Sequence, residues 1–201
     1  MDAKDWVLAS ANKGKIKELQ DMLGGLGINI TPQQDLGIED AEETGLTFVE
    51  NAILKARHAA EKSGLPAIAD DSGLEVDYLK GAPGIYSARF SGEGATDRSN
   101  LDKLMAEMQH APANQRSARY QAVIAVMRHA DDPTPIICQG SWEGNIAFEE
   151  KGTEGFGYDP IFKPADADCH AAELEKSVKN AMSHRGKAIA QLLQKLKHHN
   201  L

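Results

Sequence analysis

The chain has 201 residues, of which 41% are hydrophobic and 26% charged, and its formal net charge is -8. This length allows one domain with a proper core or two small lobes, and the composition is typical of a globular protein. The acidic balance argues against a general nucleic-acid-binding protein, which would present a basic face. A few local lysines and arginines can nevertheless bind a small anion.

The sequence also bears on where the protein is located and on the redox state of its cysteines. The apolar stretches are too short to span a membrane, and residues 1–5 lack the apolar core of a signal peptide. Cys138 and Cys169 have no metal-ligand spacing, so we expect reduced thiols in the cytoplasm. We therefore expect a cytoplasmic protein with neither a membrane nor a nucleic-acid partner.

Short apolar runs alternate with helical patterns in the first half of the chain, and strands then follow one another. Strands are predicted at 6–9, 28–31, 67–71, 74–79, 118–127, 136–142 and, more weakly, 145–149. Helices are predicted from Asn12 as N-cap to Gly24, from the capping box at Thr47 to Gly64, over about 96–108, near 171–176, and from about Ser183 onward. This order favours an α/β fold with a mixed β-sheet and flanking helices.

Two adjacent carboxylates, Asp70 and Asp71, follow the apolar residues 67–69 and precede Ser72-Gly73, which we interpret as the turn that ends the strand. Because successive strand side chains point to opposite faces, we expect only one of the two to serve a given site. Such a carboxylate can hold a cation or position a water. The alternative is a polar strand end with an Asx turn.

A second acidic pair, Glu42-Glu43, precedes the helix that begins near Thr47. Mg²⁺ bound to phosphates takes only one or two protein carboxylates and keeps several waters, so one glutamate from here and one aspartate from 70–71 would suffice. The alternative is an acidic approach to a helix N-terminus, which the helix dipole also favours.

The segment Ser10-Ala-Asn-Lys-Gly-Lys15 joins the first strand to the first helix. Free backbone N–H groups and the helix dipole make such a junction an anion site, and Lys13 and Lys15 add positive charge. The segment is not a Walker A sequence, which disfavours P-loop chemistry. A capped helix with solvated lysines is the alternative.

Two later segments suit a nucleotide base and its phosphates. In Gly152-Thr-Glu-Gly-Phe-Gly-Tyr-Asp-Pro160 the glycines bracket Phe156, so the backbone can approach a ligand while the ring stacks on a base. Lys179, His184 and Arg185 lie at or before the last helix, where cations oppose the dipole unless an anion is bound. The alternatives are a surface turn with Phe156 as a core residue, and a solvated cationic helix start.

Together these segments resemble the Ham1 family, the inosine triphosphate (non-canonical purine nucleoside triphosphate) pyrophosphatases, and its bacterial branch most. The resemblance covers the chain nearly end to end and is carried by Ser10–Lys15, Glu42–Ala52, Ala69–Leu74, Gly81–Arg89, Gly155–Pro160 and Ser183–Gly186. It implies one domain over 1–201 with an elongated mixed sheet, in two lobes around a nucleotide-binding cleft, assembled as a homodimer. It also implies Mg²⁺-dependent hydrolysis of ITP, dITP and XTP to the monophosphate and pyrophosphate.

The resemblance also implies roles for single residues. Asp71 would be the general base and a metal ligand, and Glu42 the second metal ligand, although Glu43 is an alternative. The substrate-binding residues would be Ser10, Ala11, Asn12, Lys13, Gly14, Lys15, Ser72, Phe156, Gly157, Tyr158, Asp159, Lys179, His184 and Arg185. The chain departs from many members at Ser177-Val178, where acidic residues are expected before Lys179.

Two other functions remain as alternatives at this stage. A nucleotide-binding regulatory protein without turnover would keep the cationic and aromatic residues but would not need both acidic pairs. An RNA-binding module would need a basic stripe with stacked aromatics, which the net charge and the 5% aromatic content disfavour.

Overall fold

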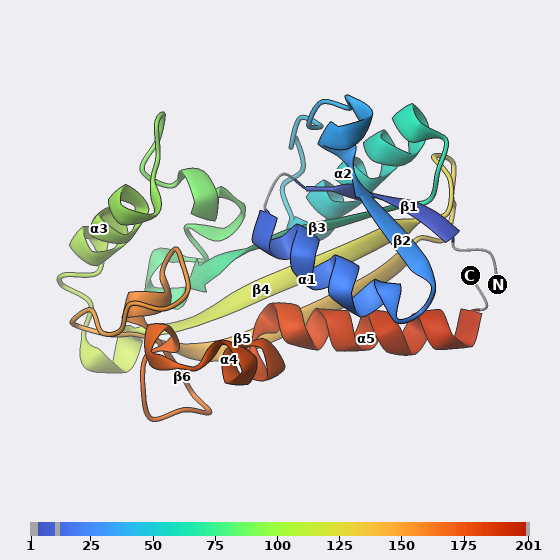
Figure 1. Ribbon diagram of the computed structural model, residues 1–201. Helices are drawn as coiled ribbons and strands as arrows, with labels where there is room; N and C mark the ends of the chain where they lie inside the picture. The colour runs from blue at the N-terminus through green and yellow to red at the C-terminus, as the bar shows by residue number, and fades with distance from the viewer. Residues whose placement is uncertain (1–3, 11–12, 200–201) are drawn as a thin grey trace. The chain divides into compact units, whose positions relative to one another are not determined.

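A computed structural model of the chain describes residues 4–10 and 13–199 (Figure 1). The chain forms two compact units. Unit 1 comprises 1–71, 123–138 and 188–201, and unit 2 comprises 72–122 and 139–187. The strands are β1 (Lys4–Ala9), β2 (Ile28–Pro32), β3 (Ala67–Val76), β4 (Ser117–Met127), β5 (Ile136–Ile146) and β6 (Phe162–Pro164). The helices are α1 (Lys13–Gly24), α2 (Phe48–Ser63), α3 (Asp97–Glu107), α4 (Lys176–Met182) and α5 (His184–His199).

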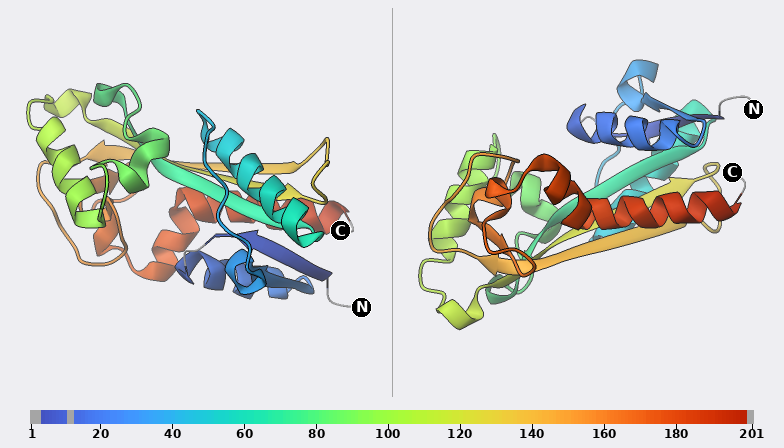
Figure 2. Two further views of the ribbon diagram at one scale, coloured as in Figure 1. Left: turned by 90° about the horizontal axis from the view of Figure 1, so that it is seen from above. Right: turned by 60° about the horizontal axis from the view of Figure 1, so that its bottom comes forward.

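The strands form one six-stranded sheet in the order β2-β1-β3-β4-β5-β6. β1 is parallel to both β2 and β3, and β5 is antiparallel to β6. In the register of this sheet Val7 lies opposite Thr31 on one side and opposite Ala67 on the other. The sheet is therefore mixed and has helices beside it, which confirms the predicted α/β architecture (Figures 1 and 2).

In unit 1, α1 packs against β2 and α2 against β1 (Figure 2). The ends of α2 follow the sequence signals. The Thr47 hydroxyl accepts a hydrogen bond from the Glu50 N–H, and Gly64 closes the helix with a left-handed φ of 70°. The alanines Ala52, Ala56 and Ala59 are fully buried along one stripe of α2, which allows the helix to approach β1 closely.

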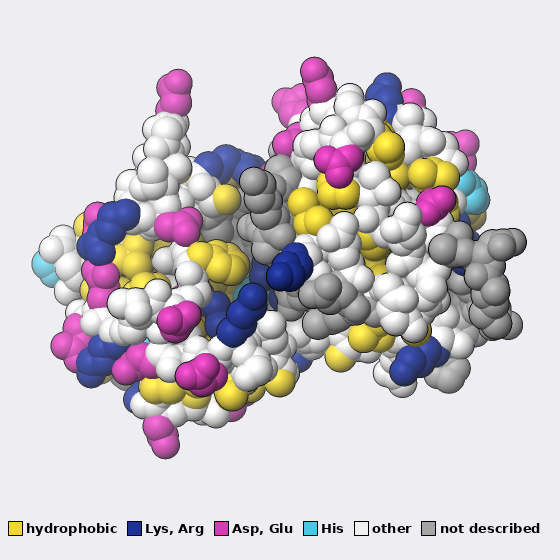
Figure 3. Space-filling view, in the orientation of Figure 1, with side chains coloured by type: hydrophobic (Ala, Val, Ile, Leu, Met, Phe, Trp, Pro, Cys, Tyr) yellow, Lys and Arg dark blue, Asp and Glu magenta, His cyan; other side chains and the backbone are white. Residues whose placement is uncertain are grey.

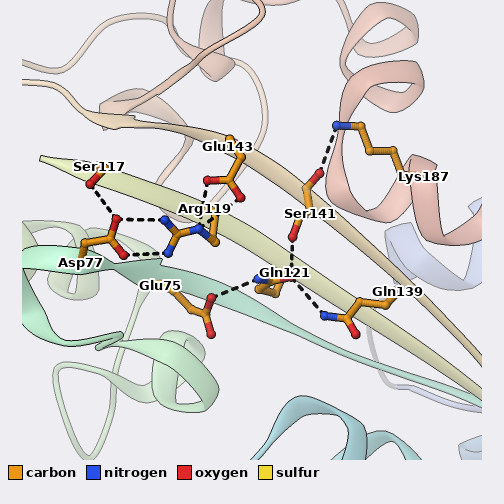
Figure 4. Close-up of polar contacts among 9 residues, drawn as sticks. All are labelled: Glu75, Asp77, Ser117, Arg119, Gln121, Gln139, Ser141, Glu143 and Lys187. Carbon is orange, nitrogen blue, oxygen red and sulfur yellow. Dashed lines mark hydrogen bonds and ion pairs between the residues drawn. The ribbon is translucent and has the colours of Figure 1, made fainter.

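In unit 2, strand alternation separates a core face from a polar face. The core contains Leu74, Trp142 and Phe162, which are almost completely buried. On the polar face, the Arg119 guanidinium binds Asp77 through two hydrogen bonds of 2.8 and 2.9 Å and also contacts Glu143 (Figure 4). The hydrogen bonds that the Asp77 carboxylate accepts, first from Arg119 and second from Ser117, lower its pKa to about 2.

A buried arginine ties the loops of unit 2 together. The Arg116 guanidinium donates hydrogen bonds of 2.7 to 3.2 Å to four carbonyl oxygens, and only 3% of the residue is exposed. The carbonyls belong to Met108, Ala111, Ile146 and Ala147. One cation thereby fixes the end of α3 to the end of β5, and burial lowers the pKa of Arg116.

Two strand predictions are wrong. Ser72-Gly73 is not a turn, because β3 continues from Ala67 to Val76 and Asp77–Leu79 form a short 3₁₀ helix. β1 pairs with β3 over Ala67–Ala69, whereas β4 lies beside β3 as far as Glu75 and favours its continuation. Asn145 and Ile146 are likewise the end of β5 rather than a separate strand.

Two short elements were not predicted in their observed form. β6 has only three residues. α4 begins at Lys176, the last residue of the helix predicted near 171–176. The predicted stretch is a 3₁₀ helix over Ala171–Glu173. Among the described residues, no helix is long and apolar enough to cross a membrane.

Candidate functional site

The two acidic pairs of the sequence come together in unit 1 around one lysine. Lys55 Nζ donates a hydrogen bond of 3.2 Å to Asp71 Oδ1 and one of 2.9 Å to Glu43 Oε1. Asp71 lies on β3 with 8% of its surface exposed, and its second oxygen, Oδ2, is fully buried. Within the described part of the chain, Oδ2 accepts no hydrogen bond. A buried carboxylate oxygen left in this state needs a water or a cation as its partner.

The charges in this cluster are strongly coupled. Burial raises the pKa of Asp71, and the charges of Glu43 and Asp70 raise it further, while Lys55 opposes the shift. Burial alone would lower the pKa of Lys55, but the charges of Asp71, Asp70 and Glu43 outweigh it, so the pKa of Lys55 is raised. Lys55 therefore stays an ammonium, and Asp71 holds its proton more firmly than an exposed aspartate does.

The geometry favours Glu43 over Glu42 as the partner of Asp71. Glu43 is half-buried and shares Lys55 with Asp71, whereas the Glu42 side chain is exposed. The carboxylates of Asp71, with its unpaired Oδ2, and Glu43 are a donor set that Mg²⁺ accepts when phosphates and water supply the other ligands. The described residues contain no group of three or more His, Cys, Asp and Glu that could enclose a metal without a substrate.

Lys55 was not predicted as a site residue, although helical periodicity could have identified it. Lys55 follows Ala52 by three residues and precedes Ala59 by four, so it belongs to the buried alanine stripe of α2. A lysine on a buried helix face requires a counter-charge. Asp71 and Glu43 supply that charge here.

The predicted phosphate loop is described in part. Ser10 follows β1 and is half-buried. α1 begins at Lys13, so Lys13, Gly14 and Lys15 form its first turn and their N–H groups lie at a helix N-terminus, as predicted. The predicted roles of Ala11 and Asn12 fall outside the described residues. The substrate contacts of this segment stay predictions.

In unit 2 the loop at Phe156 presents an exposed ring beside two cations. Phe156 is 55% exposed, so it is not a core residue. Lys179 Nζ lies 5.1 Å and the Arg185 guanidinium carbon 5.9 Å from the centre of the ring. On the face drawn in Figure 3, small groups of Lys and Arg lie among dispersed acidic side chains, so local cationic surface coexists with the net charge of -8.

Asp159 organises this loop from within. Its Oδ2 accepts hydrogen bonds from the Phe156 N–H at 2.8 Å and from Lys179 Nζ. The acidic partner of Lys179 is therefore Asp159 on the loop. The residues directly before Lys179, Ser177-Val178, carry no acidic group. A Cβ at Gly155 would lie 2.1 Å from Asp159 Oδ2, and the φ of Gly155 is 80°, so only glycine fits.

Tyr158 has a different environment from its neighbours in the loop. It is 4% exposed, and its hydroxyl donates a hydrogen bond of 2.7 Å to the Ser87 carbonyl. The hydroxyl is therefore committed to the core of unit 2, and a substrate contact from Tyr158 would have to come from its backbone. The Gly157 N–H donates to Asp97 Oδ2 at 3.0 Å, which anchors the exposed side of the loop to α3.

The start of α5 brings the remaining predicted residues together. Ser183 Oγ accepts a hydrogen bond of 3.1 Å from the Gly186 N–H and so caps the helix that was predicted to begin near this residue. Arg185 Nη2 donates to Ser72 Oγ at 3.4 Å, so the residue after Asp71 meets the last helix within unit 2. The His184 ring is 7% exposed and stacks on Tyr120, with ring centres 4.7 Å apart.

Comparison with known proteins assigns the chain, with its residues around Asp71 and around Phe156, to a family. The chain belongs to the Ham1 family, whose model matches residues 6–195. It is 58% identical over 191 residues to the dITP/XTP pyrophosphatase of Escherichia coli (strain K12), covering 95% of this chain and 97% of that protein. It is 56% identical to the dITP/XTP pyrophosphatase of Photobacterium profundum over 95% of this chain and 97% of that one.

A solved structure agrees with this assignment. The structure of a HAM1 protein from Coxiella burnetii matches with a TM-score of 0.93 and 49% sequence identity. The match covers 97% of this chain and 99% of that chain. The resemblance inferred from the sequence motifs is therefore confirmed over almost the whole chain.

Proposed function

We propose that this protein is a Mg²⁺-dependent nucleoside triphosphate pyrophosphatase that removes non-canonical purine nucleotides from the nucleotide pool. It hydrolyses ITP, dITP and XTP to the monophosphate and pyrophosphate. The observation that carries the proposal is the buried Asp71 carboxylate, with one oxygen bound to Lys55 and the other without a hydrogen-bond partner among the described residues. The similarity to dITP/XTP pyrophosphatases over 95% of the chain supports the same substrate class.

In this mechanism Asp71 acts as the general base. Its ionised carboxylate accepts a proton from the attacking water through Oδ2, while Lys55 fixes Oδ1. The water oxygen forms a bond to the α-phosphorus, and the bond from that phosphorus to the α–β bridging oxygen breaks. The electron pair leaves on pyrophosphate. Asp71 with Glu43 or Glu42 would hold Mg²⁺, which would neutralise phosphate charge.

Binding and recognition fall to the other segments. The first turn of α1, with Lys13 and Lys15, holds the triphosphate through N–H groups and lysine charges. Phe156 stacks on the purine, which contributes about 1–3 kcal/mol for a base on an aromatic ring. Arg185, beside that ring, donates to the 6-oxo group that distinguishes hypoxanthine and xanthine from adenine.

The assembly and location follow from the same proposal. We expect a homodimer, on the basis of the family resemblance, and light scattering of the purified protein tests it against the 21.7 kDa of one chain. We expect the enzyme in the cytoplasm, where its nucleotides and a reducing environment coincide. The two cysteines, Cys138 and Cys169, are free thiols.

The decisive experiment measures the products formed from a panel of triphosphates. Inosine, xanthosine, guanosine and adenosine triphosphates are incubated with and without Mg²⁺, and pyrophosphate, phosphate and monophosphate are quantified. We expect equal amounts of pyrophosphate and monophosphate from the inosine and xanthosine substrates, only with Mg²⁺. Release of single phosphates would overturn the bond assignment, and tight binding without turnover would indicate a regulatory protein instead.

A further inference from the structure

The core of unit 2 contains a tyrosine that touches both parts of the proposed base-binding surface. Tyr120 lies on β4 and is 8% exposed. Its hydroxyl donates to Asp159 Oδ1 at 3.4 Å, and its ring stacks on His184 with an interplanar angle of 11°. The 155–159 loop and the first residue of α5, which are distant in the sequence, therefore share one buried contact.

The contact to Asp159 acts on the residue that shapes the loop. Asp159 uses its other oxygen, Oδ2, to hold the Phe156 N–H and the Lys179 ammonium. A carboxylate whose two oxygens have separate partners is fixed in rotation about its terminal bond. Burial and the Asp159 charge raise the pKa of Tyr120 well above its ordinary value, so the phenol keeps its proton and remains a donor.

The contact between Tyr120 and His184 restrains the start of α5. The Tyr120 ring stacks flat on the imidazole on one side and meets the edge of Phe162 at 4.7 Å and 64°. Aromatic pairs of this kind restrict both rings. The imidazole is the first side chain of α5, so the stacking on Tyr120 restrains the start of this helix.

We propose that Tyr120 is a positioning residue for purine recognition, which aligns Phe156 and Lys179 through Asp159 and fixes the start of α5 through His184. This inference deepens the proposed function and rests on it for the identity of the ligand. Tyr120 itself does not face the substrate, because it is buried between Asp159, His184 and Phe162. Its two contacts predict separate effects when the hydroxyl or the ring is removed.

The hydroxyl is tested with Tyr120→Phe, which keeps the ring on His184. The variant should raise KM for inosine triphosphate about 3- to 10-fold, the range expected for the loss of one hydrogen bond, with kcat within about twofold. The matched control is Leu104→Ala, a fully buried residue of the same core that is not part of the aromatic cluster around Tyr120. We expect it to lower the unfolding midpoint and to leave KM unchanged.

A double-mutant cycle tests whether the effect passes through Asp159. In an Asp159→Ala background, Tyr120→Phe should change KM by less than about twofold, because the acceptor of the Tyr120 hydroxyl is already gone. Additive effects of the two substitutions, an equal KM change in Leu104→Ala, or a fall in kcat without a change in KM would each overturn the proposal.

A ligand-free measurement separates this inference from the proposed function. The backbone amide of Phe156 donates to Asp159, so its NMR resonance should shift in Tyr120→Phe, and the His184 ring resonances should shift in Tyr120→Leu. If the wild-type protein hydrolyses none of the triphosphates, the proposed function fails while these shifts still test the positioning contacts. Unchanged Phe156 and His184 resonances would overturn the inference even in an active enzyme.

Discussion

The ammonium of Lys55 lies 3.2 Å from the carboxylate of Asp71, inside unit 1, where only 17% and 11% of the two side chains are exposed. A buried ion pair of this kind is weak evidence for stability, because desolvation of both charges offsets their attraction. It is stronger evidence for function, since the pair orients Asp71 and leaves its second, buried oxygen without a hydrogen bond among the described residues.

Asp71→Asn should lower kcat by at least a hundredfold, because an amide neither accepts the proton of water nor carries charge for a cation. The unfolding free energy should change by less than about 2 kcal/mol, because the substitution also removes a buried charge. Pyrophosphate release and denaturant unfolding measure the two effects. Asp35→Asn, an exposed change in the same unit, is the control. Activity of Asp71→Asn within about tenfold of wild type would refute the assignment.

The titration of Asp71 should respond to its two neighbours in opposite directions. In the metal-free protein, Glu43→Gln should lower the pKa of Asp71, because a negative charge is removed, and Lys55→Met should raise it. Since the folded pKa lies above the ordinary 3.8, the folded protein keeps a proton that the unfolded chain has released, and Asp71 makes the fold less stable as the pH rises through that interval. Carboxyl carbon NMR measures both shifts, and the reverse order would contradict the described cluster.

The two glutamates should separate in their metal dependence. Glu43→Gln should raise the Mg²⁺ concentration for half-maximal activity at least tenfold, because Glu43 shares Lys55 with Asp71. Glu42→Gln, with its exposed side chain, should change it less than about twofold. Mg²⁺ titrations of both variants at saturating inosine triphosphate decide the question. The opposite ranking would assign the second ligand to Glu42.

Base choice should depend on Arg185. The N–H groups of Phe156 and Gly157 already donate to Asp159 and Asp97, which favours Arg185 over these two as the donor to O6. Buried polar mismatches reject an analogue by about 10⁴-fold, so kcat/KM should favour inosine over adenosine triphosphate by that order. Arg185→Met should reduce the ratio at least tenfold. Equal kcat/KM values in wild type would exclude an O6-reading pocket, and an unchanged ratio in the variant would exclude Arg185.

Arg116→Lys should destabilise the fold by about 2–4 kcal/mol, because a lysine cannot reach four carbonyl oxygens that the planar guanidinium satisfies together. Denaturant unfolding measures the loss. Arg98→Lys is the matched control, since the Arg98 side chain is 63% exposed and its substitution should cost less than about 1 kcal/mol. Similar losses in both variants would mean that the carbonyl cluster contributes little.

The sequence predicted those parts of the fold that local patterns specify. The Thr47 cap, the Gly64 stop and the strands predicted on either side of 131–135 are local signals, and each is confirmed. The turn at Ser72-Gly73 failed because β3 continues beside β4 beyond its pairing with β1 at Ala67–Ala69, and this outweighs the turn preference of two residues. Contacts from distant strands are not visible in a local window.

The candidate site likewise contains some residues that the sequence predicts and others that only the folded structure identifies. The acidic pairs and the Phe156 loop stand out in the sequence because carboxylate pairs and bracketing glycines are unusual. Lys55 and Tyr120 do not stand out, since a lysine in a helix and a tyrosine in a strand are ordinary residues there. Their importance comes from Asp71 and Asp159, which are 16 and 39 residues away in the chain and adjacent only after folding.

The left-handed backbone conformation of Gly155 limits how the sequence of this chain can diverge. Most other left-handed glycines, such as Gly37 and Gly64, have open space where a Cβ would be, but at Gly155 that space belongs to Asp159 and Lys179. A side chain at 155 must therefore displace an ion pair whose members hold the Phe156 loop. Substitutions at 155, 159 and 179 are then not independent of one another. A lineage that changes its base preference through this loop must alter these three positions together, or leave all three as they are.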